Sequence, residues 1–344
     1  MKKVLVVATS HKTRGGITSV IKAHKTGEQW KKYHCKWIET HRDGNAIIKL
    51  LYFFVALAEF ILLIPFYDLI HIHMAVATRK IPFILLAKFL HKKIIIHLHV
   101  PDPNTTILSN KKNLYGWCLK NADIVITLSS QWEKLIKDTY QIQNVITIYN
   151  PCPIVKQSDK PKEKIILYAG TISERKGYKD LLYSFASIVS KYPDWKVYLA
   201  GNGEIDKGNK LAKKLNIEKQ VFFIGWVNGL QKDEIFNKAS IFCLPSYAEG
   251  FPMAVLDAWA YGIPVICTPV GGLPDIIKDG KNCLSFKPGN RQELTQKLET
   301  LIDDDRLREK LHSESLLLAN TTFNIKNINK QIEEIYNNLL YDNR

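Results

Sequence analysis

The sequence predicts an α/β protein made of two Rossmann-like domains, each built around a parallel sheet. Short, continuous apolar runs alternate with stretches of helical spacing along the chain. This alternation is typical of parallel sheets that helices cover on both faces. The length of 344 residues suits two domains of ordinary size, and a hydrophobic content of 46% is enough for two cores.

Ten apolar runs are predicted to be strands. They lie at residues 3–8, 69–73, 94–99, 124–128, 145–149, 164–169, 196–200, 221–224, 241–245 and 265–268. Three prolines and several polar residues interrupt the pattern at 151–162, which marks a break between domains. We therefore expect an N-terminal domain at 1–155 and a C-terminal domain at 156–344. Helical spacing over about 324–340 predicts a terminal helix in the latter.

Positive charge is concentrated in the first half of the chain. Residues 1–160 hold 23 Lys and Arg against 10 Asp and Glu, whereas residues 161–344 hold 25 against 23. This asymmetry predicts that the first domain faces an anionic membrane surface or a phosphorylated acceptor. A lysine-rich surface without a partner is the open alternative. No aromatic-basic motif accompanies the lysines, so no nucleic acid partner is expected.

The six cysteines form no C-x-x-C pair, and several lie in apolar runs. This usage predicts reduced core thiols in a cytoplasmic protein. The apolar start of the chain is shorter than the core of a signal peptide, so we expect it to form the first strand.

The segment 47–66 is strongly apolar, but Lys49, Glu59 and Pro65 interrupt it. Its longest uncharged run is shorter than the ~20 residues of a spanning helix. We expect a helix that the first sheet covers on a broad side. The alternative is a helix in the membrane interface, which would attach the protein peripherally at the inner face of the cell membrane.

Two carboxylates eight residues apart mark the start and the body of one predicted helix in the segment 246–264. Pro252 suits the first turn of this helix and Gly262 its end, so Glu249 lies at the entrance and Asp257 inside. Free amide groups at the start of a helix bind anions, and carboxylates accept hydrogen bonds from hydroxyl groups. Phosphate and hydroxyl groups together indicate a sugar nucleotide.

With the strand before it and the Gly271–Gly272 turn after it, this segment resembles the E-x7-E region of family 4 retaining glycosyltransferases, which belong to glycosyl transferases group 1. Asp257 stands in place of the second Glu. The resemblance implies the GT-B fold, with two Rossmann-like domains facing a central cleft and a terminal helix packed on the first domain.

The resemblance also implies a metal-independent hexosyltransferase. The donor would be a nucleotide sugar, most often a UDP-sugar, and no further cofactor would be needed. The acceptor would be a hydroxyl of a glycan or lipid-linked molecule in surface polysaccharide assembly. A non-catalytic sugar-nucleotide-binding protein and a sugar-nucleotide epimerase on the same fold stay open.

The loop 170–177 resembles the G-R-L-x-x-x-K-G loop of this family, whose Arg and Lys neutralise the diphosphate. Lys176 matches the family Lys, but Thr171 occupies the Arg position. Arg175 lies four residues out of register and is the candidate to replace that guanidinium, which grips phosphate in a fork that Thr cannot form. A surface pair of cations in a turn is the alternative.

By the same resemblance, Glu249 contacts the donor sugar, Asp257 holds ribose hydroxyls and His99 points toward the donor. The implied catalytic residues are Glu249, Lys176 and His99. The implied donor-binding residues are Gly16, Arg175, Gly201, Gly225, Gly250, Phe251, Pro252 and Asp257.

A rival interpretation rests on two H-x-H pairs, His71 with His73 and His97 with His99. Alternate residues of a strand share a face, so such pairs could hold a metal ion, as in a metallohydrolase. Only Asp102 on the following loop adds a carboxylate. The expected site therefore includes no metal ligand.

Overall fold

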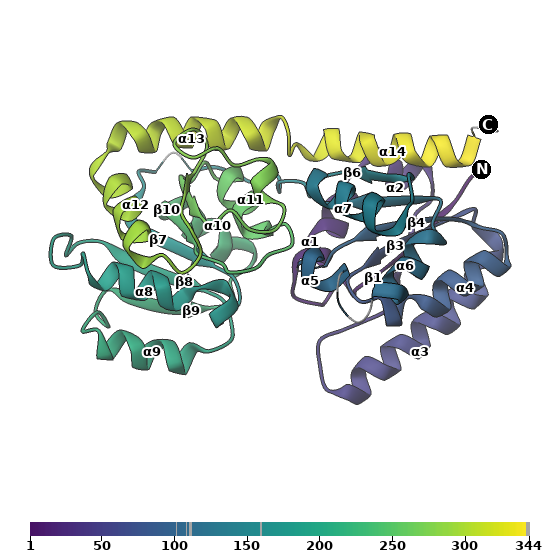
Figure 1. Cartoon of the computed structure of the whole chain (residues 1–344), viewed down its shortest axis with the longest axis horizontal. Coiled ribbons are helices and arrows are strands. Elements are labelled where there is room, and N and C mark those ends of the chain that lie inside the picture. The colour runs from purple at the N-terminus through teal and green to yellow at the C-terminus, as the bar shows by residue number, and fades with distance from the viewer. Residues whose placement is uncertain (101, 108, 110–111, 159, 342–344) are drawn as a thin grey trace. The chain divides into compact units, whose positions relative to one another are not determined.

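The computed structural model describes residues 1–344 apart from 101, 108, 110–111, 159 and 342–344. The chain forms two compact units, one of Met1–Pro151 with Ile325–Arg344 and the other of Cys152–Asn324. Each unit contains a six-stranded sheet (Figure 1). The predicted class, α/β with two Rossmann-like domains, is confirmed.

The sheet of the first unit has the order β2-β1-β3-β4-β5-β6, and its neighbouring strands are parallel. The strands are β1 (Val4–Ala8), β2 (Lys36–Glu39), β3 (Leu69–Met74), β4 (Lys93–Leu98), β5 (Ile124–Thr127) and β6 (Val145–Thr147). The helices are α1 (Gly16–His24), α2 (Glu28–Lys32), α3 (Ala46–Leu63), η1 (Ile64–Phe66), η2 (Ala77–Arg79), α4 (Ile81–Phe89), α5 (Pro103–Ile107), α6 (Lys112–Lys120), α7 (Ser130–Tyr140) and α14 (Ile325–Tyr341).

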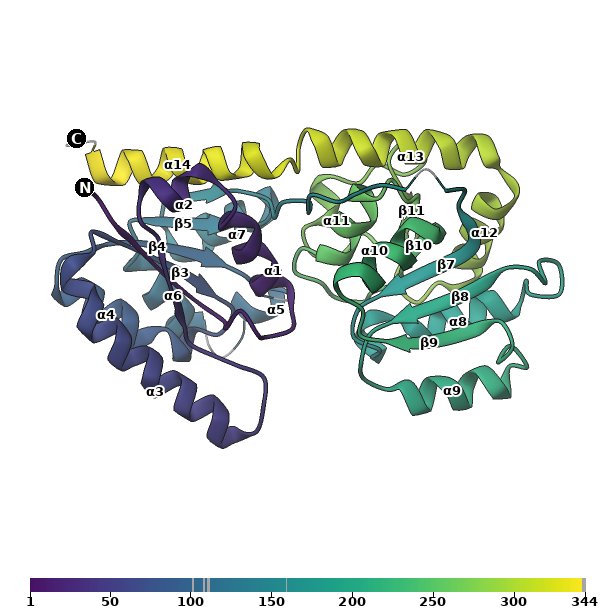
Figure 2. The ribbon, with the colours of Figure 1, turned by 180° about the vertical axis from the view of Figure 1, so that it is seen from behind.

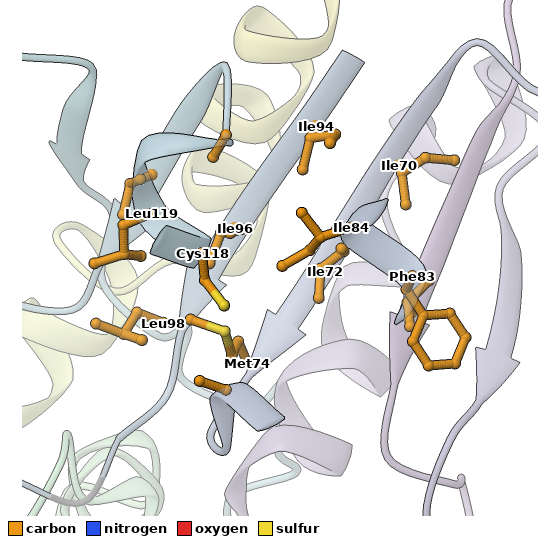
Figure 3. Packing of buried hydrophobic residues seen from close by; sticks show 14 of the residues in the cluster. Ile70, Ile72, Met74, Phe83, Ile84, Ile94, Ile96, Leu98, Cys118 and Leu119 are labelled. Atoms are coloured by element: carbon orange, nitrogen blue, oxygen red, sulfur yellow. The ribbon is translucent and has the colours of Figure 1, made fainter. Parts of the chain in front are cut away.

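Alternate residues of the central strands of this sheet enter two different cores, because successive side chains of a strand face opposite sides. On one side, Ile72 of β3 and Ile96 of β4 belong to a cluster with Ile84 of α4 and Cys118 of α6 (Figure 3). These side chains are fully buried. The continuous apolar runs of the sequence are thus explained by burial on both faces.

The opposite side of the sheet is covered by α14, which follows the second unit in sequence. Leu69 of β3 and Ile95 of β4 share a cluster with Ile328 and Ile332 of α14. Figure 2 shows α14 running along the first unit beside α2. The predicted packing of the terminal helix on the first domain is confirmed. The assignment of all of 156–344 to the second domain is wrong at its end, because the apolar face of α14 is buried by the first sheet.

Helix α3 packs through a narrow strip and leaves most of its apolar surface exposed. Only Ala56 and Phe60 of this helix are buried. Its exposed large apolar residues are Ile47, Ile48, Leu50, Leu51, Phe54, Val55, Ile61 and Leu62. Among the described residues, Ala46–Phe66 is the one helical segment long and apolar enough to cross a membrane, and 17% of that window is buried. The expectation of a helix covered by the sheet is therefore wrong.

The second unit contains a parallel sheet of order β12-β11-β10-β7-β8-β9. The strands are β7 (Glu163–Ala169), β8 (Lys196–Ala200), β9 (Val221–Gly225), β10 (Ala239–Leu244), β11 (Val265–Cys267) and β12 (Leu284–Ser285). The helices are η3 (Glu174–Lys176), α8 (Tyr178–Ala186), α9 (Ile205–Lys214), α10 (Gly229–Lys238), α11 (Met253–Ala260), η4 (Leu273–Asp275), α12 (Arg291–Asp303) and α13 (Asp305–Asn320).

Candidate functional site

The strand order of the second unit reverses at β7, which lies between β10 and β8. In open α/β sheets, ligands bind beyond the carboxyl ends of the strands at such a switch point. The loop after β7 carries Arg175 and Lys176, and the loop after β10 carries Glu249. The topology therefore brings together two segments that are more than seventy residues apart in sequence.

Lys176 and Glu249 form a close ion pair at this point. Lys176 Nζ lies 2.5 Å from Glu249 Oε1. The hydroxyl of Ser246 donates to the same carboxylate oxygen at 2.6 Å. The side chain of Lys176 is 14% exposed and that of Glu249 is 6% exposed. The pair is thus shielded from water, which strengthens its attraction and fixes the ammonium group in one position.

Arg175 joins this group from the other side of the carboxylate. Its guanidinium donates to the carbonyl of Ala248 at 2.5 Å and lies 3.9 Å from Glu249 Oε2. The side chain is 46% exposed, so it is partly open to solvent. A guanidinium four residues away from the expected register therefore still reaches the same loop cluster as Lys176.

Glycine at two positions allows the loops to approach each other closely. Gly177 has φ +72°, and a Cβ there would lie 1.8 Å from the carbonyl oxygen of Pro245. Gly271 has φ +67°, and a Cβ there would lie 2.2 Å from Gly250 O and 2.4 Å from Glu249 O. Backbone hydrogen bonds complete the junction, from Tyr247 N to Arg175 O at 2.8 Å and from Gly272 N to Gly250 O at 2.8 Å.

Helix α11 begins at Met253, a few residues after Glu249 and Gly250. Pro252 occupies its N-cap position, and no side chain caps the first turn. The phenyl ring of Phe251 is buried against Phe323, with ring centroids 5.8 Å apart. Phe251 and Pro252 can therefore contact a ligand mainly through the backbone, whose amide groups at the start of the helix suit an anion.

Asp257 lies farther along α11 and is paired with a lysine of α10. Lys232 Nζ is 2.7 Å from its carboxylate. Burial raises the pKa of Asp257 above the ordinary value, while the nearby Lys232 opposes this rise. A ribose hydroxyl that bound Asp257 would have to share the carboxylate with Lys232.

The two other predicted glycines of this unit differ in their surroundings. A Cβ at Gly201 would lie 1.8 Å from Gly170 O, so this glycine allows the loops after β7 and β8 to pack together. Gly225 has φ +72° with nothing within 4 Å of an added Cβ. Its surroundings are open, and the side chain of Trp226 beside it is 40% exposed.

Gly16 and His99 lie in the first unit. Gly16 is the first residue of α1, and the preceding Gly15 has φ +152° with open space around it. His99 follows β4, and its Nε2 lies 2.9 Å from Nδ1 of His73. Lys176, Arg175, Glu249 and Gly250 thus lie together in the second unit, whereas Gly16 and His99 belong to the other.

Sequence reasoning missed a network around the carboxylate of Asp180 that supports the Glu249 loop. The hydroxyl of Tyr247 donates to Asp180 Oδ2 at 2.6 Å, and Arg291 Nε donates to Asp180 Oδ1 at 2.6 Å. Asp180 is buried. No local pattern indicates this network, because Arg291 lies 111 residues from Asp180 in sequence.

Comparison with known proteins agrees with this geometry. Residues 154–316 match the family model described as Glycosyl transferases group 1. This matched range is similar to glycosyl transferases group 1 and covers a little less than half of the chain. The matched range of the group 1 model contains Lys176, Glu249 and Asp257.

Two curated relatives of this chain match over a little more than half of their lengths. An uncharacterized glycosyltransferase of Haemophilus influenzae is 31% identical over 203 residues, which cover 57% of this chain and 56% of that protein. The lipopolysaccharide 1,6-galactosyltransferase of Salmonella typhimurium is 29% identical over 210 residues, which cover 58% of this chain and 57% of that protein.

Among solved structures, HepE of Anabaena in complex with UDP and glucose matches with a TM-score of 0.79. The identity is 18%, and the match covers 98% of this chain and 99% of that one. This likeness confirms the predicted GT-B class, with two parallel sheets surrounded by helices.

Proposed function

We propose that the protein is a retaining glycosyltransferase that moves a sugar from a nucleotide-sugar donor to a hydroxyl acceptor. The observation that carries this proposal is the buried Lys176–Glu249 pair at the switch point of the second sheet. A fixed ammonium group, a guanidinium and free helix amides there suit a diphosphate. The carboxylate beside them suits sugar hydroxyls.

In the proposed reaction, the oxygen of the acceptor hydroxyl attacks the anomeric carbon from the side on which the diphosphate leaves. The bond between that carbon and the phosphate oxygen breaks, and the departing phosphate takes the acceptor's proton. The main catalytic task is to stabilise the charge on the leaving diphosphate. Lys176, Arg175 and the amides of α11 supply this positive potential, so transfer needs no metal ion at the phosphates.

The proposed donor is a UDP-hexose. Support comes from HepE of Anabaena, which was solved with UDP and glucose and has the same fold. The loops after β8 and β9, with Gly201 and Gly225, are the candidates to receive the base, and Asp257 is the candidate to hold the ribose.

Substitution of the ion pair tests this function. Transfer from a panel of UDP-, GDP- and ADP-sugars is measured as release of the nucleoside diphosphate. Lys176→Ala and Glu249→Ala are each expected to lower the rate by about 10²-fold or more, because a preorganised group that stabilises the leaving charge typically contributes that much. Full activity of both variants would refute the proposal.

Lys179→Ala is the matched control. Lys179 lies in the first turn of α8 and pairs with Glu174 on the surface. Its loss removes the same charge without touching Glu249, so the rate is expected to stay near that of the wild type.

The alternatives predict different products. A binding protein without chemistry would bind the nucleotide sugar and release nothing. An epimerase would convert the donor sugar without an acceptor, so analysis of the sugar products in the absence of acceptor distinguishes it from a transferase.

The proposed acceptor is a glycan or lipid-linked glycan in surface polysaccharide assembly, at the cytoplasmic face of a membrane. Support comes from the match to the Salmonella typhimurium lipopolysaccharide galactosyltransferase and from the exposed apolar face of α3. Strands β2 and β3 precede and follow α3 and belong to the same sheet. A spanning helix would separate them, so α3 is proposed to lie in the interface plane of the membrane.

Cations lie on α3, on the neighbouring α4 and near the ends of α3. Lys49 on α3 and Lys88 on α4 are exposed. Arg42 donates to the hydroxyl of Tyr52 at 3.2 Å, and Lys92 donates to the carbonyl of Pro65 at 3.2 Å, near the two ends of α3. Basic groups around an inserted apolar face add attraction to anionic lipid headgroups.

A further inference from the structure

Five histidines gather in the first unit, in the core that lies between the sheet and helices α1 and α14. His71 and His73 belong to β3, His97 to β4 and His24 to α1, and His99 follows β4. Ring contacts connect each of the five to at least one other. The four histidines in β3, in β4 and at the residue after β4 occupy the side of the sheet opposite to the cluster of Figure 3, because they alternate with the isoleucines shown there.

Three of these side chains converge. One ring nitrogen from each of His71, His73 and His97 lies within 4.8 Å of the others, and all three residues are buried. Their ring centroids are 4.6, 4.8 and 5.6 Å apart. Imidazoles bound to one tetrahedral Zn²⁺ through nitrogens at 2.0–2.1 Å have centroids about 5 Å apart. The rings are therefore spaced as ligands of one metal ion would be.

Several buried nitrogens of this cluster have no hydrogen-bond partner among the residues that the structure describes. These atoms are Nε2 of His71, Nε2 of His24, and both Nδ1 and Nε2 of His97. Buried polar atoms in folded proteins almost always have partners, so several orphans in one place indicate a missing ligand. A metal ion would accept a lone pair from each ring.

In His24 and His71 the second ring nitrogen, Nδ1, has a hydrogen-bond partner. His24 Nδ1 lies 2.8 Å from Asn329 Oδ1, which also accepts from Gln29 Nε2 at 2.9 Å. Because Oδ1 is an acceptor, His24 donates through Nδ1, and its lone pair lies on Nε2. His71 Nδ1 lies 2.7 Å from the Tyr336 hydroxyl. Such outer partners orient metal-binding histidines in known sites.

We propose that His71, His73 and His97 bind one Zn²⁺ ion, with His24, whose buried Nε2 has no partner among the described residues, as the candidate for the fourth ligand. Imidazole nitrogens are preferred ligands of this ion. The three ligands are buried, as they are in closed structural zinc sites. The ion would therefore stabilise the fold, and it would not activate water as the zinc ion of a metallohydrolase does.

The ion would join β3 and β4 in the sheet and, through His24 and the partners on α14, the helices that cover it. It would also fix the proton of His73 on Nδ1 when Nε2 binds the ion. His73 then donates to His99 Nε2, from which it is 2.9 Å away. This inference does not depend on the proposed transferase activity.

Co²⁺ binding to the full chain tests the site. The protein is stripped with a chelator and titrated with Co²⁺, whose visible absorption is intense in tetrahedral sites, and the bound Co²⁺ is then displaced with Zn²⁺. We expect one Co²⁺ per chain with a tetrahedral spectrum that Zn²⁺ abolishes. His97→Ala is expected to remove the spectrum. His91→Ala, which changes an exposed histidine of the same unit, is expected to retain it.

The absence of a tetrahedral spectrum in the folded wild-type chain would overturn the proposal, as would equal binding by folded His97→Ala. If circular dichroism shows that His97→Ala is unfolded, the Co²⁺ affinity of Tyr336→Phe is measured instead. This variant removes only the hydroxyl that orients His71. Loss of an outer partner typically weakens metal binding about 10–100-fold, so a weaker Co²⁺ affinity supports the site and an unchanged affinity overturns it.

Discussion

At the scale of single residues, two glycines with the same backbone conformation differ in what surrounds them. Gly271 and Gly280 have φ +67° and +69°. A Cβ at Gly271 would meet the carbonyls of Glu249 and Gly250, whereas a Cβ at Gly280 would meet nothing within 4 Å. Gly271→Ala should therefore displace the Glu249 loop and lower UDP affinity about tenfold or more, a change that calorimetric titration measures.

Gly280→Ala is the matched control for this experiment. Both alanines carry the strain of a left-handed backbone, about 1 kcal/mol. Equal UDP affinity in the two variants would show that the contact of Gly271 with the Glu249 loop does not shape the donor site.

Lys80 is a buried cation whose charge depends on pH. It donates to Thr40 Oγ1 at 2.7 Å, and burial, with the charge of Arg79 as a second cause, lowers its pKa to about 7. The unfolded chain keeps this proton up to about pH 10. Between these values the unfolded state binds more protons, so the free energy of unfolding should rise with pH, by up to about 1.4 kcal/mol per unit.

Lys80→Met should remove this dependence. The variant is expected to be more stable than the wild type at about pH 6, and the difference should shrink toward about pH 9 as folded Lys80 loses its proton. Urea denaturation at the two pH values measures both effects. A constant difference between wild type and variant would contradict the buried, titrating lysine.

The residues of the candidate site could be predicted only in part. Glu249 and Lys176 lie in loops with turn glycines and flanking strands, so their sequence surroundings are informative. Their 2.5 Å contact depends on the adjacency of β7 and β10, which no local pattern contains. The pairing of Asp257 with Lys232 and the support of Tyr247 by Asp180 are tertiary contacts of the same kind.

At the scale of elements, α3 is the helix with the most exposed apolar surface in the first unit, and it is expected to bind membranes. Leu51, Phe54 and Leu62 are 59%, 56% and 71% exposed. Changing all three to Glu should abolish co-flotation with vesicles that contain phosphatidylglycerol, because burial of this apolar face in the interface drives binding.

Leu317→Glu is the control for this prediction, since Leu317 of α13 is 54% exposed in the other unit. It should float with vesicles as the wild type does. Flotation of the triple variant at the wild-type level would exclude α3 as the membrane contact.

Strands that are buried on both faces were predictable, because each forms a continuous apolar run. The edge strands β2 and β12 were missed. In β2 only Ile38 is fully buried, and β12 spans two residues, so neither has the apolar run of a central strand. The prediction that the sheet covers α3 was wrong for the opposite reason. The composition of α3 is that of a buried helix, but its contacts with the sheet are few.

At the scale of the whole molecule, two separate units predict two thermal transitions. By calorimetry on the full chain, UDP at about 100 times its dissociation constant should stabilise one transition by about 2.7 kcal/mol and leave the other unchanged. Zn²⁺ should raise the other transition. If a single transition responded to both ligands, the units would unfold together, and their ligands could not be assigned separately.

The sequence by itself determined the α/β class, the break between the two strand series and the loops that carry Lys176 and Glu249. These features follow from local properties, namely apolar runs, prolines and glycines in turns. Only the tertiary structure decided that α14 belongs to the first sheet, that α3 stays exposed and that three histidines converge. These outcomes depend on which surfaces bury each other, and residues far apart in the chain supply those surfaces.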